Sequence, residues 1–112
     1  MHHLPVRGRN LALGGLLGAV LLFAQDWKTL VKLPDVDLSG LSAIRSRAVL
    51  RLLRNHDCSC GCGMKIAECR VKDPGCAYSK GVSAAMVDAI RAGKNENDAI
   101  AAAKETRWGK GP

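Results

Sequence analysis

Residues 58–79 read CSCGCGMKIAECRVKDPGCAYS, and this stretch holds all five cysteines of the 112-residue chain. Three of them alternate with a serine and a glycine, and two more follow at Cys69 and Cys76. A small exported domain buries too little apolar surface to rely on its core alone and commonly uses disulfides instead. The stretch is therefore predicted to hold the fold together. Because the number of cysteines is odd, one thiol remains after pairing.

The sequence on either side of the cysteines predicts helices. From Ser39 or Ser42, either of which can cap a helix, a pattern with helical spacing runs to about Asn55. Its predicted apolar face consists of Ile44, Ala48, Val49, Leu52 and Leu53, and its other side carries Arg45, Arg47, Arg51 and Arg54. This arginine side is either a docking surface or simply a solvated helix face.

Three further helical segments are shorter. Residues 64–70 predict a short helix, and Asp73-Pro74-Gly75 predicts the turn that delivers Cys76 to the next one. That next helix is expected over residues 82–92, with Ser79 or Ser83 as its cap and Gly93 as its stop. Asn95 is expected to cap a last helix. With no segment alternating in the manner of a strand, the predicted fold is all-α, with three or four short helices around a cysteine-rich loop.

The N-terminal segment is predicted to be a hydrophobic leader helix. Residues 11–24 (LALGGLLGAVLLFA) are uninterrupted apolar residues that follow Arg7 and Arg9, the layout of a secretory signal. As a helix the run is about 21 Å long, shorter than the ~30 Å hydrocarbon core of a bilayer. Leu22 is a poor residue near a cleavage site, and Trp27 and Lys28 suit a membrane interface. A cleaved signal peptide and an uncleaved anchor therefore both remain open.

These features give the predicted domain organisation and location. Residues 1–24 are the signal peptide or membrane anchor, 25–38 a linker, 39–108 the cysteine-rich helical domain and 109–112 a frayed tail. The chain is expected in the bacterial cell envelope, periplasmic or membrane-anchored and facing outside the cytoplasm. Its formal net charge of +7 suits anionic lipids or acidic partners. With one Phe, one Tyr and two Trp it has few stacking platforms, so no nucleic-acid partner is expected.

The cysteines permit three kinds of chemistry. As staples, five cysteines allow at most two disulfides, and the pairing is open on spacing alone. As a metal site, Cys58, Cys60 and Cys62 with Met64 and His56 would form a soft cluster that suits copper, whereas zinc sites usually show paired CxxC spacing. As a redox pair, Cys60 and Cys62 precede a short helix whose N-terminus would favour a thiolate. The CxxC spacing of thioredoxin-type enzymes is absent from the sequence.

The motif also resembles a known class of sequences. CGCGMKIAECRVKDPGCAYS is similar to the small exported bacterial cysteine-rich helical segments with a CxCGC…AxCR…DPxC…S pattern, which occur beside DsbA-like thioredoxin domains. It resembles more weakly the CcmH-type thiol proteins of cytochrome c maturation, whose CxxC is missing here. The resemblance implies that Cys60 pairs with Cys76 and Cys62 with Cys69, leaving Cys58 free. It also implies that a thioredoxin-like partner would be a separate envelope protein.

Taken together, the sequence predicts an exported or membrane-tethered helical module that is stapled by disulfides. It would act as an accessory or interaction domain in envelope thiol-disulfide chemistry and would not be an enzyme by itself. One alternative is a copper- or zinc-binding cysteine module, and another is a thiol-disulfide oxidoreductase. The disulfide interpretation expects no cofactor, and the metal interpretation expects copper or zinc.

Overall fold

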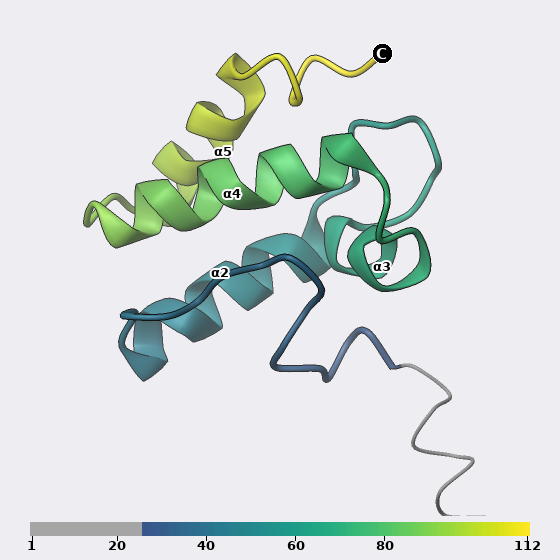
Figure 1. Cartoon of the computed structure of the whole chain (residues 1–112). Coiled ribbons are helices and arrows are strands. Elements are labelled where there is room, and N and C mark those ends of the chain that lie inside the picture. Colours follow the sequence, from purple (N-terminus) through teal and green to yellow (C-terminus); the bar gives the residue numbers. More distant parts are fainter. Residues whose placement is uncertain (1–25) are drawn as a thin grey trace, which may run out of the picture.

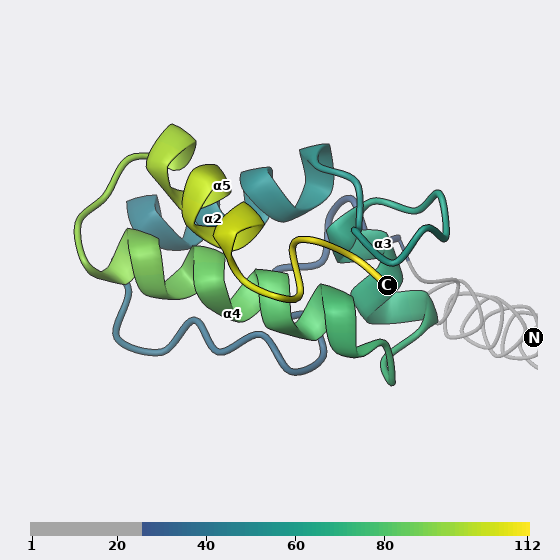
Figure 2. The same cartoon turned by 90° about the horizontal axis from the view of Figure 1, so that it is seen from above.

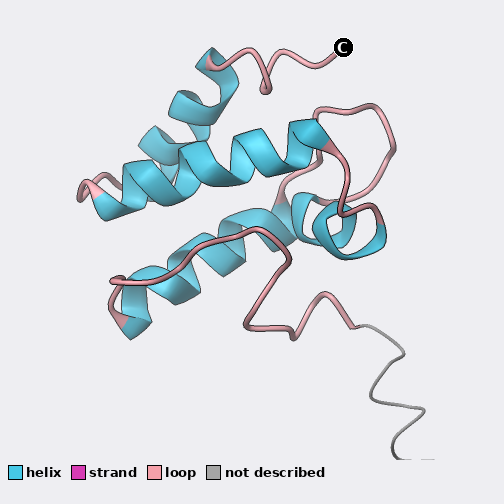
Figure 3. Cartoon of the chain, in the orientation of Figure 1, coloured by secondary structure: helices cyan, strands magenta, loops and turns pink. Residues whose placement is uncertain are grey.

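The computed structural model describes residues 26–112, and in this range it is helical. Its helices, labelled as in Figure 1, are α2 (Ala43–Asn55), α3 (Ile66–Lys72), α4 (Ala77–Arg91) and α5 (Glu96–Glu105). This part of the chain contains no strand (Figure 3), and its one isolated β-bridge joins Asp57 and Lys65. The all-α prediction is confirmed for these residues. The predicted leader helix lies outside the described residues.

Local capping residues set several helix ends where the sequence predicts them. Ser42 Oγ accepts a hydrogen bond from the Arg45 amide at 3.2 Å and begins α2. Asn95 Oδ1 accepts one from the Asp98 amide at 2.8 Å and begins α5. Gly93 follows α4 with φ of 87°, a conformation that glycine adopts without steric cost. These bonds satisfy backbone groups that the helix leaves unpaired at its ends.

The start of α4 differs from the prediction. The helix begins at Ala77, and its N-cap is Cys76. Ser79 and Ser83, the two predicted caps, instead lie buried inside the helix, where Ser83 Oγ donates to the Ser79 carbonyl at 2.6 Å. Small serines fit a crowded helix contact when this internal bond satisfies the hydroxyl. The buried face of α4 therefore extends one to two turns further toward the cysteines than its apolar stripe indicates.

The core lies where α4 packs against each of the other three helices (Figure 2). Ile44 was expected on the buried face of α2, but it is 71% exposed. Leu50, which that face omitted, is buried instead. The reason is that α2 is covered on two sides, by α4 and by a second segment of the chain. Buried residues of the helical core include Val49, Leu50, Leu52, Leu53, Val82, Met86, Val87, Ile90, Ala99 and Ala103.

That second segment, residues 26–41, crosses α2 as an irregular strap (Figure 1). Leu33 of the strap is 5% exposed and belongs to the core. Arginine side chains from two helices form hydrogen bonds with its backbone. Arg54 donates to the Leu30 carbonyl at 2.7 Å, and Arg91 donates to the Asp37 and Ser39 carbonyls. Most of the predicted linker is thus packed against the helical domain. Among residues 26–112, no helix combines the length and apolar character needed to cross a membrane.

The C-terminal segment returns to the cysteine-rich loop (Figure 2). Trp108 packs edge-on against Tyr78, with 5.9 Å between the ring centroids. A Cβ added at Gly81 would lie 2.1 Å from the Trp108 ring, so the glycine is what allows the ring to sit there. Ser59 Oγ donates to the Trp108 carbonyl at 2.6 Å. The end of the chain is thereby tied to the loop that carries Cys58 and Cys60.

Candidate metal-binding cysteine site

The first part of the site is a tight loop between α2 and α3. The Ile66 amide donates to the His56 carbonyl, and the Cys58 amide donates to the Met64 carbonyl, each at 2.9 Å. These bonds bring the two arms of the loop together. Its tip turns through Gly61 and Gly63, both at positive φ (82° and 78°), where an L side chain would be strained.

The second part of the site comes from the two helices that follow. Cys69 lies in α3 and is fully buried. The turn after α3 closes with a 2.9 Å bond from the Cys76 amide to the Asp73 carbonyl, and Cys76 then caps α4. Its Sγ lies 3.5 Å from the Ser79 amide, from which it accepts a hydrogen bond. The predicted Asp73-Pro74-Gly75 turn therefore does return Cys76 toward the rest of the cysteines.

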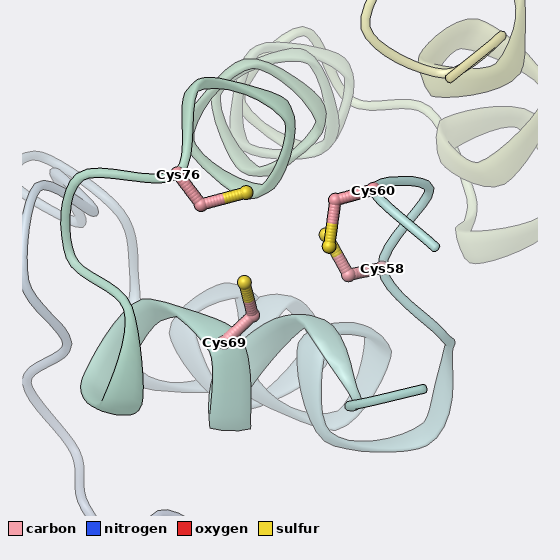
Figure 4. Close-up of side chains that lie close together, drawn as sticks. All are labelled: Cys58, Cys60, Cys69 and Cys76. Atoms are coloured by element: carbon pink, nitrogen blue, oxygen red, sulfur yellow. The ribbon is translucent and has the colours of Figure 1, made fainter. Parts of the chain in front are cut away.

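These two parts bring four sulfur atoms together. The Sγ atoms of Cys58, Cys60, Cys69 and Cys76 all lie within 4.8 Å of one another. Figure 4 shows the side chains of Cys69 and Cys76 pointing from α3 and the start of α4 toward those of Cys58 and Cys60 on the loop. We call these four residues the cysteine cluster. Cys58, Cys69 and Cys76 are at most 9% exposed and Cys60 is half-buried. All five cysteines of the chain are free thiols in the structure.

A buried arginine fixes the backbone around the cluster. Arg70, next to Cys69, is 0% exposed. Its guanidinium donates to the Ser79 hydroxyl at 2.9 Å, and to the carbonyls of Cys76 (3.0 Å), Pro74 (2.8 Å) and Pro34 (3.2 Å). One side chain thus joins α3, the turn after it, the start of α4 and the strap. A planar fork of five donors is what allows so many partners at once.

The protonation of the cluster depends on burial and on these hydrogen bonds. Burial raises the pKa of Cys58, and it raises the pKa of Cys69 to about 12. Burial also raises the pKa of Cys60. For Cys76, burial is the largest single influence, but hydrogen bonds from Ser79 and its neighbours outweigh it and lower the pKa to about 7. Without a cation, Cys76 is the member of the cluster that ionises first.

Cys62 stands apart from the cluster but touches it. Its side chain is exposed, and its Sγ lies 2.6 Å from the Sγ of Cys60. The hydrogen bond with Cys60 is the main influence that lowers the pKa of Cys62. Cys62 is therefore the accessible thiol of the chain, placed beside the least buried member of the cluster.

The donor set suits a soft or borderline cation. Zinc binds thiolates at about 2.3 Å in tetrahedral geometry, which places sulfurs about 3.8 Å apart. The cluster, with separations up to 4.8 Å, needs a contraction of only about 1 Å to reach that geometry. Four thiolates around a divalent cation keep an excess of negative charge. Arg70, the residue after Cys69, is a buried cation of this region, and its guanidinium pairs with the Asp35 carboxylate at 3.5 Å.

The structure divides the residues that the sequence suggested as metal ligands. Cys58 and Cys60 are in the cluster, and Cys69 and Cys76 complete it. Met64 is half-buried against the core and contributes its backbone carbonyl to the loop. His56 is half-buried beside a cavity of about 240 Å³ that Ile66, Met86 and Ile100 also line. The disulfide pairing of Cys60 with Cys76 and of Cys62 with Cys69 stays a prediction.

Two residues that shape the site were missed by sequence reasoning. Arg70 looks like an ordinary basic residue in the last turn of a short helix, and Ser79 looks like a cap. Their joint role depends on Pro34, which is 36 positions away from Arg70, and no local pattern signals such a contact. Comparisons with models of known protein families, with curated proteins and with solved structures find no match.

Proposed function

We propose that the domain binds one zinc ion through Cys58, Cys60, Cys69 and Cys76 and is a metal-stabilised helical module. The observation that carries this proposal is the convergence of four sulfur atoms within 4.8 Å from two separate elements and a loop. Monovalent copper accepts the same donors, so the metal found in the protein decides between the two.

The proposed role of the metal is structural. A zinc ion with four protein ligands has no open position for water or substrate, which is the arrangement of structural rather than catalytic sites. Burial of most of the cluster fits that role, as does the support from Arg70 and Ser79. The module would present a surface to a partner and would not carry out a reaction at the metal.

Metal reconstitution of the full-length reduced chain tests the proposal. One cobalt ion per chain is expected, with the absorption spectrum of tetrahedral thiolate coordination, and zinc should displace it. Cys76→Ser should abolish stoichiometric binding. Cys62→Ser is the matched control, since it removes a thiol from the same region but not from the cluster, and it should bind normally. Equal binding by wild type and Cys76→Ser would disprove the assignment.

A second candidate follows from the contact between Cys60 and Cys62, whose sulfurs are 2.6 Å apart. In an oxidising envelope the module would be stapled by disulfides and would take part in thiol-disulfide chemistry. An exposed Cys62 thiolate could attack the disulfide of a separate thioredoxin-like protein. Cys60 would then resolve the mixed disulfide, so that the Cys60–Cys62 bridge forms and both partner sulfurs leave as thiols.

The two candidates predict different numbers of free thiols per chain. Disulfide stapling predicts one free thiol per chain, no metal, and cross-linked peptides that report the pairing. Zinc binding predicts five reduced thiols, of which only Cys62 reacts quickly with an alkylating reagent. An exchanging Cys60–Cys62 pair would show a reduction potential near those of disulfide exchange catalysts.

A further inference from the structure

A second feature of the molecule lies on α2, and none of its residues belongs to the cysteine cluster. An open cavity of about 490 Å³ lies between the start of the strap and the last two turns of α2. We call it the basic cavity, and it is lined by Trp27, Lys28, Arg47, Arg51, Arg54 and Asn55. Four of its six lining residues are cationic and none is acidic. A concave surface of one sign concentrates ions of the other sign.

Most of this charge is not neutralised by the described residues. Among residues 26–112, Lys28 and Arg47 have no ion pair, and both are exposed. Arg51 is the exception, since it pairs with Glu96. The 2.7 Å hydrogen bond from Lys72 is the main influence that lowers the pKa of Glu68, and the charge of Lys28 is a smaller one. The cavity therefore keeps at least two free cations.

Arg54 adds a further positive charge to the lining of the cavity. Its Nη2 donates to the Leu30 carbonyl, but its Nε is buried and has no hydrogen-bond partner among the described residues. Leaving a buried polar group unpaired costs stability. Phosphate oxygens match arginine donors in geometry and charge. The cavity thus offers arginine and lysine side chains of the kind that bind an oxyanion.

The position of the cavity indicates where such an oxyanion comes from. The apolar run of residues 11–24 ends four positions before Lys28. Four residues span at most about 14 Å, which bounds the distance along the chain between the end of the run and Lys28. Trp27 is a residue type enriched at headgroup level, and Lys28 lies 5.5 Å from the centre of its ring. If the leader occupies a bilayer, Lys28 at the rim of the cavity lies near the headgroups.

We propose that the basic cavity binds the phosphate of an anionic phospholipid headgroup and so seats the helical domain on the membrane surface. This proposal is independent of the metal and rests on the leader being inserted in the bilayer. It would fix the orientation of the domain, with α2 toward the lipid. The part of the strap that is bonded to Arg91, at Asp37 and Ser39, does not line the cavity and would not contact the lipid.

Binding of the full-length chain to vesicles tests this proposal. Vesicles of neutral phosphatidylcholine are compared with vesicles that also contain phosphatidylglycerol, at one ionic strength. The double variant Lys28→Gln/Arg47→Gln should lose about 25-fold in preference for the anionic vesicles, roughly fivefold for each basic side chain. The control Lys80→Gln/Lys110→Gln removes the same charge from exposed positions outside the cavity and should retain the preference.

Three results would overturn the proposal. One is the absence of any preference for anionic vesicles in the wild-type chain. Another is an equal loss in the control variant, because binding would then reflect total charge alone. The third is release of the chain from anionic vesicles by submillimolar inorganic phosphate at constant ionic strength, which would identify a soluble phosphate ligand instead of a lipid. Arg54→Gln should lower the preference roughly fivefold, the effect of one basic side chain, with metal content unchanged.

Discussion

The part of the domain between His56 and Ser79 and the part where α4 turns into α5 bury different kinds of groups. In the first, the cysteine end, the buried residues are Cys58, Ile66, Ala67, Cys69, Arg70, Cys76 and Ser79. In the second, the hairpin end, they are Met86, Val87, Ala89, Ile90, Ala99 and Ala103. The cysteine end buries three thiols, a guanidinium and a hydroxyl beside two apolar side chains, whereas the hairpin end buries apolar side chains alone.

This difference teaches that the two ends depend on different forces. The hairpin end is stabilised by removal of apolar surface from water, which needs no particular partner. The cysteine end buries polar groups, which is favourable only when each has its partner. A cation or a set of cross-links would complete the cysteine end. The hairpin end needs no cation or cross-link for its stability.

Among the tests of this difference between the two ends, removal of the proposed metal should have the largest effect on stability. Structural zinc contributes about 10–16 kcal/mol of binding free energy in small peptides at pH 7, so if the proposed zinc is bound, a chelator should unfold the cysteine end. Hydrogen exchange of the full chain should show amides in residues 56–72 losing protection. Amides of α5 and the second half of α4 should lose much less. Uniform loss at both ends would show that the comparison is wrong.

Replacement of Arg70 should have the next largest effect. Arg70→Met leaves three carbonyls and the Ser79 hydroxyl without their donor, at an expected cost of about 3–5 kcal/mol of unfolding free energy. Zinc affinity should fall with it, since the Cys69–Cys76 geometry is no longer fixed. Arg70→Lys should recover only part of both, because an ammonium lacks the planar fork. Arg45→Met, at an exposed position, is the control, and a similar cost there would contradict the role of Arg70.

A steric change where the C-terminal segment packs on the first half of α4 tests packing without replacing a member of the cysteine cluster. Gly81→Ala would place a methyl group 2.1 Å from the Trp108 ring and force it to move. Overpacking of this kind costs about 1–3 kcal/mol, partly offset by the better helix propensity of alanine, up to about 1 kcal/mol. Thermal unfolding and Trp fluorescence should both change while zinc binding stays stoichiometric. Gly75→Ala, where no atom lies within 4 Å of the added Cβ, should be nearly neutral.

The smallest expected effect concerns the ion pair between Arg51 of α2 and Glu96 of α5. The hydrogen bond with Arg51 lowers the pKa of Glu96. A depressed pKa stabilises the fold above the unfolded-state pKa, and this contribution disappears as the pH falls through the folded-state pKa. Because the pair is exposed, Glu96→Gln should cost under about 1 kcal/mol at pH 7. Urea unfolding should show no difference between variant and wild type in strong acid, and a difference that grows there would contradict this account.

The sequence predicted best what depends on neighbouring residues. The helical class of residues 26–112, the caps at Ser42 and Asn95 and the stop at Gly93 all follow from local hydrogen bonding and backbone preference. Ile44 was assigned to the wrong face because the sequence does not reveal that the strap covers α2 next to Leu50. The early start of α4 was missed because cysteine is an unusual cap and the buried serines look polar.

The candidate site was predicted only in part, for a similar reason. The stretch 58–79 was recognised as decisive, and Cys58 and Cys60 were named among the candidate ligands. Spacing favoured their near neighbours Cys62 and Met64 as further ligands, because ligands close in sequence are the ones that a pattern displays. Cys69 and Cys76 join the cluster only through the turn between α3 and α4 and through the contacts of Arg70, which are tertiary.

The most direct test is the native mass of the full-length chain as it is purified from cells without reductant or added metal. Metal binding by the cysteine cluster predicts one species, with the mass of the reduced chain plus one zinc or copper ion minus the displaced thiol protons. A metal-free species that lacks four hydrogen atoms, the signature of two disulfides, would contradict it and favour stapling. The reduced, metal-free mass with a compact charge distribution would contradict both.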